Sequence, residues 1–477
     1  MIRSMNIAWW VQRWSELHPD KPAVIFEEEQ ITYVELNQRA NRASCWLQSL
    51  GIEKGDRVAV MLNNCPEFIE LFLACARLGA IFVPLNFRSA PPELEYFLKN
   101  CRPRLFVFGQ EFLANVNNVD FENTKPQVLL SSVGNVSTGT AVLDYAGESA
   151  AFEGRKPFLS RSLGPADPEE PQVIMYTSGT TGRPKGAVLS HRKTFFNCLN
   201  ADILVMHPKF DPHKVYQDIE RYRVTKFLGV PTVYRALVQV DPQQRGDVSS
   251  LKVCAGGGEK TTPELFEKCR EAGLAFRQVM GQTETSILLW ASEEDSFRKP
   301  GTVGRPVFHA EVNIVDKTGR PVKPGDIGEI VVRGSIMMKE YWQDPVRTEE
   351  TIRNGMLYTG DLARSDEEGY YFLVDRARDM YITGGENVYP AEVERILRAH
   401  PEIEDIAVVG VPDERWGEVG KAFVIPKKDS NLAAESLIGF CQERMAKFKC
   451  PKQVEFREDS GMTDPKKNRP FRRKGLF

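Results

Sequence analysis

The stretch that decides the fold is YTSGTTGRPKGAV, residues 176–188. It contains four Thr and Ser hydroxyls, three glycines and two cations, and it follows the apolar, β-branched segment PQVIM. Glycines let backbone N–H groups approach a polyanion, hydroxyls add donors or hold a metal, and Lys185 adds a point charge that suits phosphate. The pattern predicts a phosphate-binding loop after a strand. A solvated turn is the alternative that the loop alone leaves open.

The composition excludes several classes of protein. The chain has 477 residues, which indicates two to four domains, and its hydrophobic and charged fractions of 42% and 27% are ordinary for a globular protein. A net charge of −3 gives no reason to expect nucleic acid or an anionic membrane as a partner. The nine cysteines form no C-x-x-C pair, so we expect reduced thiols in a cytoplasmic protein rather than a zinc knuckle or a redox motif.

Neither apolar segment of the N-terminal part predicts a targeting or membrane element. Residues 1–26 have no apolar core that ends in a small-residue cleavage site, so we expect no signal peptide. Residues 68–85, FIELFLACARLGAIFVPL, contain Glu70 and Arg77 and end near a proline. A buried helix that runs into a strand fits this segment better than a spanning helix does, so no integral membrane segment is expected.

Four more motifs follow the loop in a fixed order: VCAGGGE at 253–259, VMGQTET at 279–285, YTGD at 358–361 and DRARDMYITGGENVYP at 375–390. Together with the loop they resemble the adenylate-forming superfamily of acyl-CoA synthetases, adenylation domains and firefly-type luciferases, over nearly the whole chain. The resemblance implies that ATP and a small-molecule carboxylic acid form an acyl-AMP with release of pyrophosphate. Coenzyme A then displaces AMP, and Mg²⁺ assists at the phosphates.

The resemblance also implies a role for individual residues. The phosphate loop would consist of Thr177, Ser178, Gly179, Thr180, Thr181, Gly182 and Lys185. Thr180 and Glu284 would be the magnesium ligands, since both offer the hard oxygen donors that Mg²⁺ prefers. Gly257, Gly258 and Glu259 would line the adenine slot, because a flat base needs backbone without side chains. Lys185, Glu284 and Lys467 would be the catalytic residues.

The remaining nucleotide contacts come from three motifs. Met280, Gly281, Gln282 and Thr283 would lie along the nucleotide, Asp361 would accept from the ribose hydroxyls, and Arg376 would reach the ribose or the phosphates. Met280 replaces the aromatic residue that relatives usually stack on adenine, so we expect weaker stacking. Simpler interpretations remain open: Asp361 as a turn residue, Arg376 as a solvated linker charge, and Glu284 as a carboxylate at a helix N-terminus.

The fold class expected is α/β. We expect a large N-terminal domain of mixed α/β sheets with a small β-barrel-like unit, residues 1–375, and a small mobile α/β domain, residues 376–477. Residues 309–334 have a β pattern with two turn signals and predict the antiparallel unit. By resemblance the small domain rotates at Asp375–Arg376 between the two half-reactions. Gly384 and Gly385 would then face the active site, where they permit close approach of the pantetheine arm.

Two departures from the family pattern concern whole segments. The stretch from His191 to Gly256 is clearly shorter than in relatives, which place a strand, a helix and part of the acyl pocket there. The shortening falls between about 200 and 215, and the loss of a strand–helix unit would leave backbone donors unpaired and apolar faces uncovered. In the C-terminal stretch 460–477, MTDPKK is the nearest match to the usual Thr-x-x-Gly-Lys, with Lys466 in place of the glycine before Lys467. Either a phosphate-gathering tail or a basic disordered tail fits this stretch.

Three functional hypotheses follow. The first is an active acyl-CoA synthetase, with a medium- to long-chain fatty acid as the first candidate substrate and an aryl acid as the second. Another is a stand-alone adenylation enzyme that loads a carrier protein. The last is a degenerate homologue that retains only nucleotide binding. The sequence leaves the choice of acid open, and a homodimer is one assembly that it allows.

Overall fold

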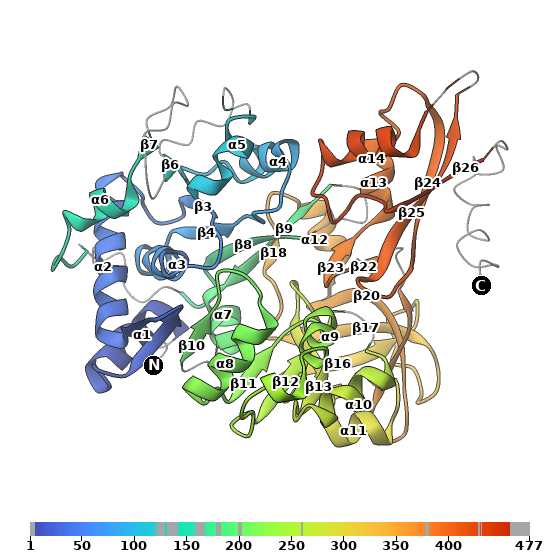
Figure 1. The fold of residues 1–477 in the computed structure, drawn as a ribbon, viewed down its shortest axis with the longest axis horizontal. Helices are drawn as coiled ribbons and strands as arrows, with labels where there is room; N and C mark the ends of the chain where they lie inside the picture. Colours follow the sequence, from blue (N-terminus) through green and yellow to red (C-terminus); the bar gives the residue numbers. More distant parts are fainter. Residues whose placement is uncertain are drawn as a thin grey trace.

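The chain forms a large part and a smaller C-terminal part, which Figure 1 shows at the upper right in orange and red. The computed structural model describes residues 5–119, 121, 129–130, 142–157, 167–177, 183–198, 203–258, 261–376, 381–427, 430 and 432–457. Among these residues, no helix is long and apolar enough to cross a membrane.

A six-stranded sheet forms the first half of the large part. Its strands, in spatial order, are β18 (Glu340–Tyr341), β9 (Lys185–Ser190), β8 (Pro171–Thr177), β4 (Ile81–Pro84), β3 (Arg57–Met61) and β5 (Leu105–Phe108). β3 is parallel to both β4 and β5, and β4 is parallel to β8. The pairs β8–β9 and β9–β18 are antiparallel. The predicted strand before the phosphate loop is therefore β8, and β9 returns directly beside it.

Helices cover both faces of this sheet, because successive strand residues point to opposite sides. Val58 and Val60 of β3 pack with α2 (Tyr33–Ser49) and α3 (Pro66–Leu78). Ala59 and Met61 pack on the other face with α4 (Pro91–Cys101). The apolar segment 68–85 is thus a buried helix that leads into strand β4, as the sequence predicted.

A second sheet continues the large part in the order β11 (Lys226–Leu228), β12 (Val253–Gly256), β13 (Phe276–Gln282), β14 (Ser286–Trp290) and β15 (Arg305–Pro306). Its parallel half packs on three helices: α8 (Pro212–Tyr222), α9 (Pro231–Val238) and α10 (Pro263–Glu271). The carboxyl ends of β12 and β13 carry the GGG and GQTE motifs, which brings two sequence motifs to one edge of a sheet.

A three-stranded sheet joins two N-terminal strands to a strand near residue 205. It has the order β10 (Leu204–Met206), β1 (Pro22–Phe26) and β2 (Glu29–Thr32), and it packs with α1 (Ile7–Leu17). Among the described residues, β10 pairs only with β1, and β11 pairs only with β12. Leu204 is 46% exposed and Leu228 is 72% exposed. Among the described residues, both strands therefore lie at sheet edges and carry exposed apolar side chains.

An antiparallel sheet forms the barrel-like unit predicted from residues 309–334. Its strands are β16 (Ala310–Val315), β17 (Gly328–Gly334), β20 (Met356–Ser365) and β19 (Ile352–Arg353), with β21 (Tyr371–Arg376) paired to β20. One apolar core joins this sheet to β8, β9 and β14. β20 and β21 form an antiparallel hairpin that ends at Arg376.

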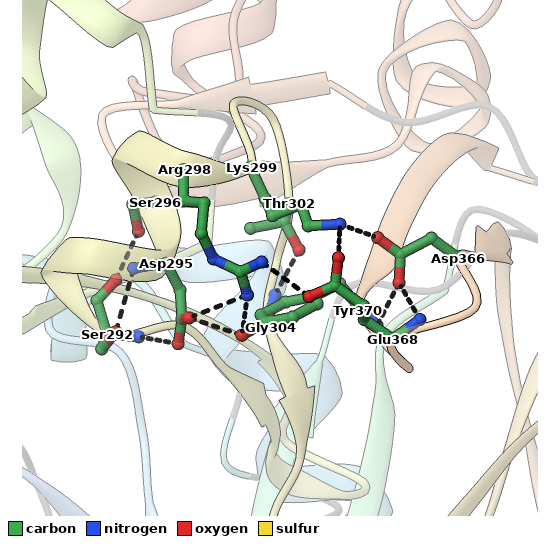
Figure 2. Close-up of polar contacts among 10 residues, drawn as sticks. All are labelled: Ser292, Asp295, Ser296, Arg298, Lys299, Thr302, Gly304, Asp366, Glu368 and Tyr370. Carbon is green, nitrogen blue, oxygen red and sulfur yellow. Dashed lines mark hydrogen bonds and ion pairs between the residues drawn. The ribbon is translucent and has the colours of Figure 1, made fainter.

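Charged side chains fasten the turn of that hairpin to α11 (Glu293–Arg298), as Figure 2 shows. Arg298 contacts Glu368 at 2.6 Å, and Lys299 contacts Asp366 at 2.8 Å and Glu368 at 2.6 Å. Arg298 also donates to the Tyr370 hydroxyl at 2.8 Å. A network of this kind fixes geometry better than one exposed ion pair does, so it holds β20 and β21 in place against the second sheet.

The smaller part contains a sheet ordered β23 (Glu386–Val388), β22 (Tyr381–Thr383), β25 (Gly417–Pro426) and β24 (Ile403–Asp413), with β26 (Gln453–Phe456) beside β25. Val393 and Leu397 of α13 (Pro390–Leu397) are fully buried against this sheet, together with α14 (Ala434–Gln442). The remaining short elements are η2 (Gln110–Phe112), α5 (Leu113–Val116), β6 (Leu129–Leu130), β7 (Val142–Leu143), α6 (Tyr145–Ala150), α7 (His191–Cys198), η4 (Pro242–Gln244) and α12 (Pro345–Thr351).

Candidate active site

A chain of hydrogen bonds joins the two flanks of the phosphate loop to Glu284. The Thr177 hydroxyl, at the end of β8, donates to Glu284 Oε1 at 3.2 Å. The Tyr341 hydroxyl donates to the same oxygen at 2.9 Å and accepts from Lys185 Nζ at 3.0 Å. Glu284, Lys185 and Tyr341 are all buried. The structure thus brings together Thr177, Lys185 and Glu284, three residues that the motifs predicted to share a site.

Tyr341 is the member of this network that the sequence did not reveal. It lies on β18, where it pairs with Ala187 of β9, and its ring also lies 4.3 Å from Lys185 Nζ. Burial and the nearby Glu284 carboxylate raise the pKa of the Tyr341 hydroxyl, so it stays protonated and can donate. The two-residue strand Glu340–Tyr341 carries no recognised motif, and only its pairing with β9 places the hydroxyl here.

The donor set suits a magnesium ion that also binds phosphate. Mg²⁺ is held in nucleotide sites by one or two carboxylates together with substrate phosphate oxygens, so a lone Glu284 with a neighbouring hydroxyl fits that pattern. The part of the chain that the structure describes has no group of three or more His, Cys, Asp or Glu that could form an all-protein metal cage. Thr180, the second predicted ligand, lies outside the described residues.

A second polar pair lies where β13 ends beside β20. Gln282 Nε2 donates to Asp361 Oδ2 at 2.7 Å and to the Thr359 carbonyl at 2.9 Å. Asp361 is also the register partner of Arg376 on the neighbouring strand β21. Three of the predicted nucleotide residues, Gln282, Asp361 and Arg376, are therefore adjacent, although the Arg376 side chain lies outside the description.

Two glycines at this edge are sites where a side chain does not fit. A Cβ on Gly257 would collide with the backbone oxygen of Val279, and one on Gly281 would collide with the backbone of Ser286. Glycine is therefore required at both positions by the close approach of neighbouring backbone, and the adenine slot stays a prediction. Met280 lies between them and is buried in the apolar core with Leu288 and Leu289. Its contact with adenine stays a prediction, as do the roles of the neighbouring Gly258 and Thr283.

A buried lysine outside the motifs supports the Glu284 segment. Lys193 on α7 has no exposed surface, and its Nζ donates to Ser286 Oγ at 2.8 Å and to the Ile336 carbonyl. Burial lowers the pKa of Lys193 to about 7, with Glu284 opposing that shift. Ser286 itself has a left-handed backbone, φ 59°, so this bond holds a strained turn directly after Glu284.

The GGEN turn of the C-terminal part faces the same edge. A Cβ on Gly385 would meet the side chain of Val230 at 2.6 Å, and the Gly385 carbonyl lies 3.9 Å from the position of a Cβ on Gly258. Arg88 Nη1 lies 3.5 Å from Glu386 Oε1 at the rim of this contact. The turn therefore packs against the end of β12 that carries the GGG motif, and its part in the second half-reaction stays a prediction.

Several predicted residues cannot be placed. They are Ser178, Gly179, Thr180, Thr181, Gly182, Glu259 and Lys467, all of which lie outside the described residues. The structure thus describes the two flanks of the phosphate loop but not its centre, and the predicted site of Lys467 is untested.

Replacing Asp361 by alanine should raise the KM for ATP by about tenfold, because a carboxylate that accepts from ribose hydroxyls would be lost. We would measure initial rates of pyrophosphate release at varied ATP concentration. Asp366→Asn is the matched control, since Asp366 lies on the turn of the same hairpin and contacts Lys299. An unchanged KM for ATP in Asp361→Ala would contradict the assignment of the ribose site.

Comparison with known families gives two matches along the chain. The AMP-binding enzyme family matches residues 11–207 and 201–342, and the AMP-binding enzyme C-terminal domain matches residues 392–467. The first match is in two pieces that meet at β10, where the chain is short.

Three relatives have related activities. A feruloyl-CoA synthase of Amycolatopsis sp is 35% identical over 491 positions, which cover 95% of this chain and 96% of the relative. Because 491 positions exceed the 477 residues of this chain, the relative carries residues that this chain lacks. The indoleacetate–CoA ligase of Aromatoleum aromaticum is 33% identical over 95% of both chains. A long-chain-fatty-acid–CoA ligase of Escherichia coli O157:H7 is 32% identical over 93% of this chain and 89% of its own.

One solved enzyme resembles this chain to different degrees in two states. A double mutant of o-succinylbenzoate CoA synthetase (MenE) from Bacillus subtilis, bound to the product analogue OSB-NCoA, has a TM-score of 0.83 at 27% identity and covers 94% of this chain and 95% of its own. The same enzyme with the acyl-adenylate intermediate OSB-AMP has a TM-score of 0.68 at 28% identity and covers 94% of both chains. At similar coverage and identity, the overall structure of this chain is therefore more similar to the first of these two structures.

The family matches, the relatives that span nearly the whole chain and the shared two-domain fold lead to one conclusion: this chain belongs to the AMP-binding enzyme family, among the AMP-forming acyl-CoA ligases.

Proposed function

We propose that the protein activates an organic acid as acyl-AMP, with release of pyrophosphate, and then transfers the acyl group to coenzyme A. The observation that carries this proposal is the hydrogen-bonded group of Thr177, Lys185, Tyr341 and Glu284 at the phosphate loop. A preorganised cation and a metal-binding carboxylate at one point suit the charge that develops when the α-phosphate is attacked.

The roles proposed for the chain's own residues follow from this geometry. Lys185 binds a phosphate oxygen, and Glu284, held by Thr177 and Tyr341, binds the magnesium ion, which would neutralise charge on the phosphates. Gln282 orients Asp361 toward the ribose hydroxyls. Gly257 and Gly281 keep the adenine slot free of side chains. Lys467, outside the described residues, is proposed to serve acyl-AMP formation far more than the thioester step.

We also propose that the small domain begins at Arg376 and rotates there. Two features support the thioester-forming orientation for the present arrangement: the contact of Gly385 with Val230, and the greater similarity to MenE bound to a CoA product analogue. In this orientation the GGEN turn would border the path of the pantetheine thiol.

The acid is proposed to be aromatic first and a medium- to long-chain fatty acid second. The order follows the identities of the relatives, which are higher for the feruloyl and indoleacetate ligases than for the fatty acid ligase. The sequence alone had favoured a fatty acid. Both kinds of acid need an apolar pocket, part of which relatives build from the segment that this chain lacks.

Pyrophosphate release by purified protein tests the proposal. The assay contains ATP, Mg²⁺ and a panel of hydroxycinnamic, indolyl and C6–C18 acids, with and without CoA. We expect acid-dependent release, with an acyl-CoA product when CoA is present. Release without any acyl-CoA product would favour a carrier protein as the acceptor. Silence across the panel, from protein that still binds ATP, would contradict the proposal and favour a degenerate homologue.

A further inference from the structure

A buried ion cluster crosses the seam between the two domains. Glu93 lies in the first turn of α4 in the large domain, whereas Lys449 and Glu392 belong to the small domain. Lys449 Nζ contacts Glu93 Oε1 at 2.5 Å and Glu392 Oε1 at 2.8 Å. In Figure 1, α4 and the red segment that contains α14 lie at the top of the seam. One ammonium group thus bridges a carboxylate of its own domain and one of the other.

The cluster is shielded from water, so its contacts are strong. The side chains of Lys449 and Glu93 are each 9% exposed, and that of Glu392 is 2% exposed. Burial alone would lower the pKa of Lys449, but the two carboxylates outweigh it and the pKa is raised. The lysine is therefore charged in this arrangement. Ion pairs with this little exposure are screened by salt far less than surface pairs are.

Glu93 also holds the backbone of the other domain. Its Oε2 accepts from the backbone N–H of Ala446 at 2.7 Å, in addition to the N–H of Ala90 at 3.1 Å at the start of its own helix. One carboxylate therefore makes two contacts with the segment 446–449. Arg88 and Glu386 form another ion pair across the same seam. It is exposed and 3.5 Å long, so it contributes little to the free energy that holds the two domains together.

These contacts belong to one orientation of the small domain. A rotation about residue 376 would carry the segment 446–449 away from α4, while Lys449 would keep Glu392 as a partner. Glu93 would then lose both of its partners across the seam. We propose that Glu93 and Lys449 are positioning residues that hold the small domain in the thioester-forming orientation, an inference that rests on the proposed two-step function.

The proposal predicts opposite effects on the two half-reactions. Loss of the Glu93 charge removes the ion pair with Lys449 across the seam but leaves Lys449 paired with Glu392. Because one oxygen of Glu93 accepts from both Ala90 and Ala446, the amide oxygen of glutamine can keep those two weaker, neutral hydrogen bonds. The small domain would then spend more time in other orientations. Thioester formation should become slower, whereas acyl-AMP formation should be unchanged or faster. A merely structural role would lower both rates together.

The test compares Glu93→Gln with Glu95→Gln, a matched control on the same helix, where Glu95 pairs with the exposed Lys99. Acyl-AMP formation is followed as pyrophosphate release in a single turnover without CoA. Thioester formation is followed separately, from preformed acyl-AMP and CoA. In Glu93→Gln we expect the thioester rate to fall by at least about tenfold, as for other buried charge pairs at interfaces, and the adenylation rate not to fall. Lys449→Met should give the same split.

A structural readout keeps this inference separate from the proposed function. Spin labels at the exposed positions 117 in the large domain and 404 in the small domain report the distance between the domains without any catalysis. We expect one dominant distance in the parent protein and in Glu95→Gln, and a broadened or shifted distribution in Glu93→Gln. If the parent protein forms no acyl-AMP, the proposed function fails. The distances still show whether the Glu93–Lys449 pair holds the domains in one orientation. Unchanged distances in Glu93→Gln, or a parallel fall of both rates, would overturn the proposal.

Discussion

Replacing Glu284 by glutamine should lower the rate of acyl-AMP formation by about 10²–10³, the range found when a preorganised electrostatic group is removed from an active site. Glutamine keeps the size of the side chain and an oxygen that can accept from Thr177 and Tyr341, but it removes the charge that would bind Mg²⁺. Pyrophosphate release measured at varied Mg²⁺ concentration should show a higher metal requirement together with a lower maximal rate.

Tyr341→Phe separates the charge of Glu284 from its orientation. The variant removes one donor to Glu284 Oε1 and the acceptor of Lys185 Nζ, while the ring stays in the core. We expect a smaller loss of about tenfold, since the carboxylate remains and only its hydrogen bonding changes. Equal activity in Glu284→Gln and the parent protein would contradict the assignment of Glu284 as the metal ligand.

Replacing Lys193 by methionine should stabilise the fold at pH 6 and flatten the rise of stability above pH 7. The pKa of Lys193 is about 7 in the folded protein against an ordinary value of 10.5. Between these pH values the unfolded chain binds more protons than the folded one, so the free energy of unfolding increases with pH across that window. The whole shift corresponds to about 5 kcal/mol, which is the penalty carried at pH 6, where both states are charged.

Two lost hydrogen bonds offset part of that gain. The bonds of Lys193 to Ser286 and Ile336 contribute about 1 kcal/mol each, so the net gain of Lys193→Met at pH 6 should be about 3 kcal/mol. Urea unfolding at pH 6, 8 and 9.5, followed for the transition of the large domain, measures it. Lys339→Met is the control, because Lys339 lies close in sequence to Ile336, the acceptor of Lys193, but is exposed. A Lys193→Met protein that is less stable than the parent at pH 6 would contradict this account.

The sequence predicted those helices, strands and turns whose signal lies in neighbouring residues of the chain. The helix and strand of residues 68–85 were predicted from an apolar run that contains Glu70 and Arg77 and ends near a proline. The strand before the loop was predicted from its β-branched residues. The GGG and GQTE motifs each come at the end of a strand, and the carboxyl ends of parallel strands meet at one edge of a sheet. In each case the signal lies within about 20 residues of its consequence.

The residues that were missed depend on contacts between distant segments. Tyr341 reaches Glu284 only because β18 pairs with β9, and Lys193 reads in the sequence as an ordinary cation near the start of α7. Nothing in either local sequence specifies burial beside a carboxylate. Glu93, likewise, lies at a position that predicts a helix cap, and only the packing of the small domain shows its second set of partners.

The pairing of β1 with β10 has a consequence for synthesis of the chain on the ribosome. Val24 pairs with Leu204, so β1 leaves the ribosome long before its parallel partner exists. At a translation rate of about 5–20 residues per second, the interval lasts on the order of 10–40 s. During that time the nascent chain presents the unpaired edge of β1, and an edge of this kind can pair with another nascent chain on the same message. The first strand of the chain therefore stays without its parallel neighbour until β10 has been synthesised.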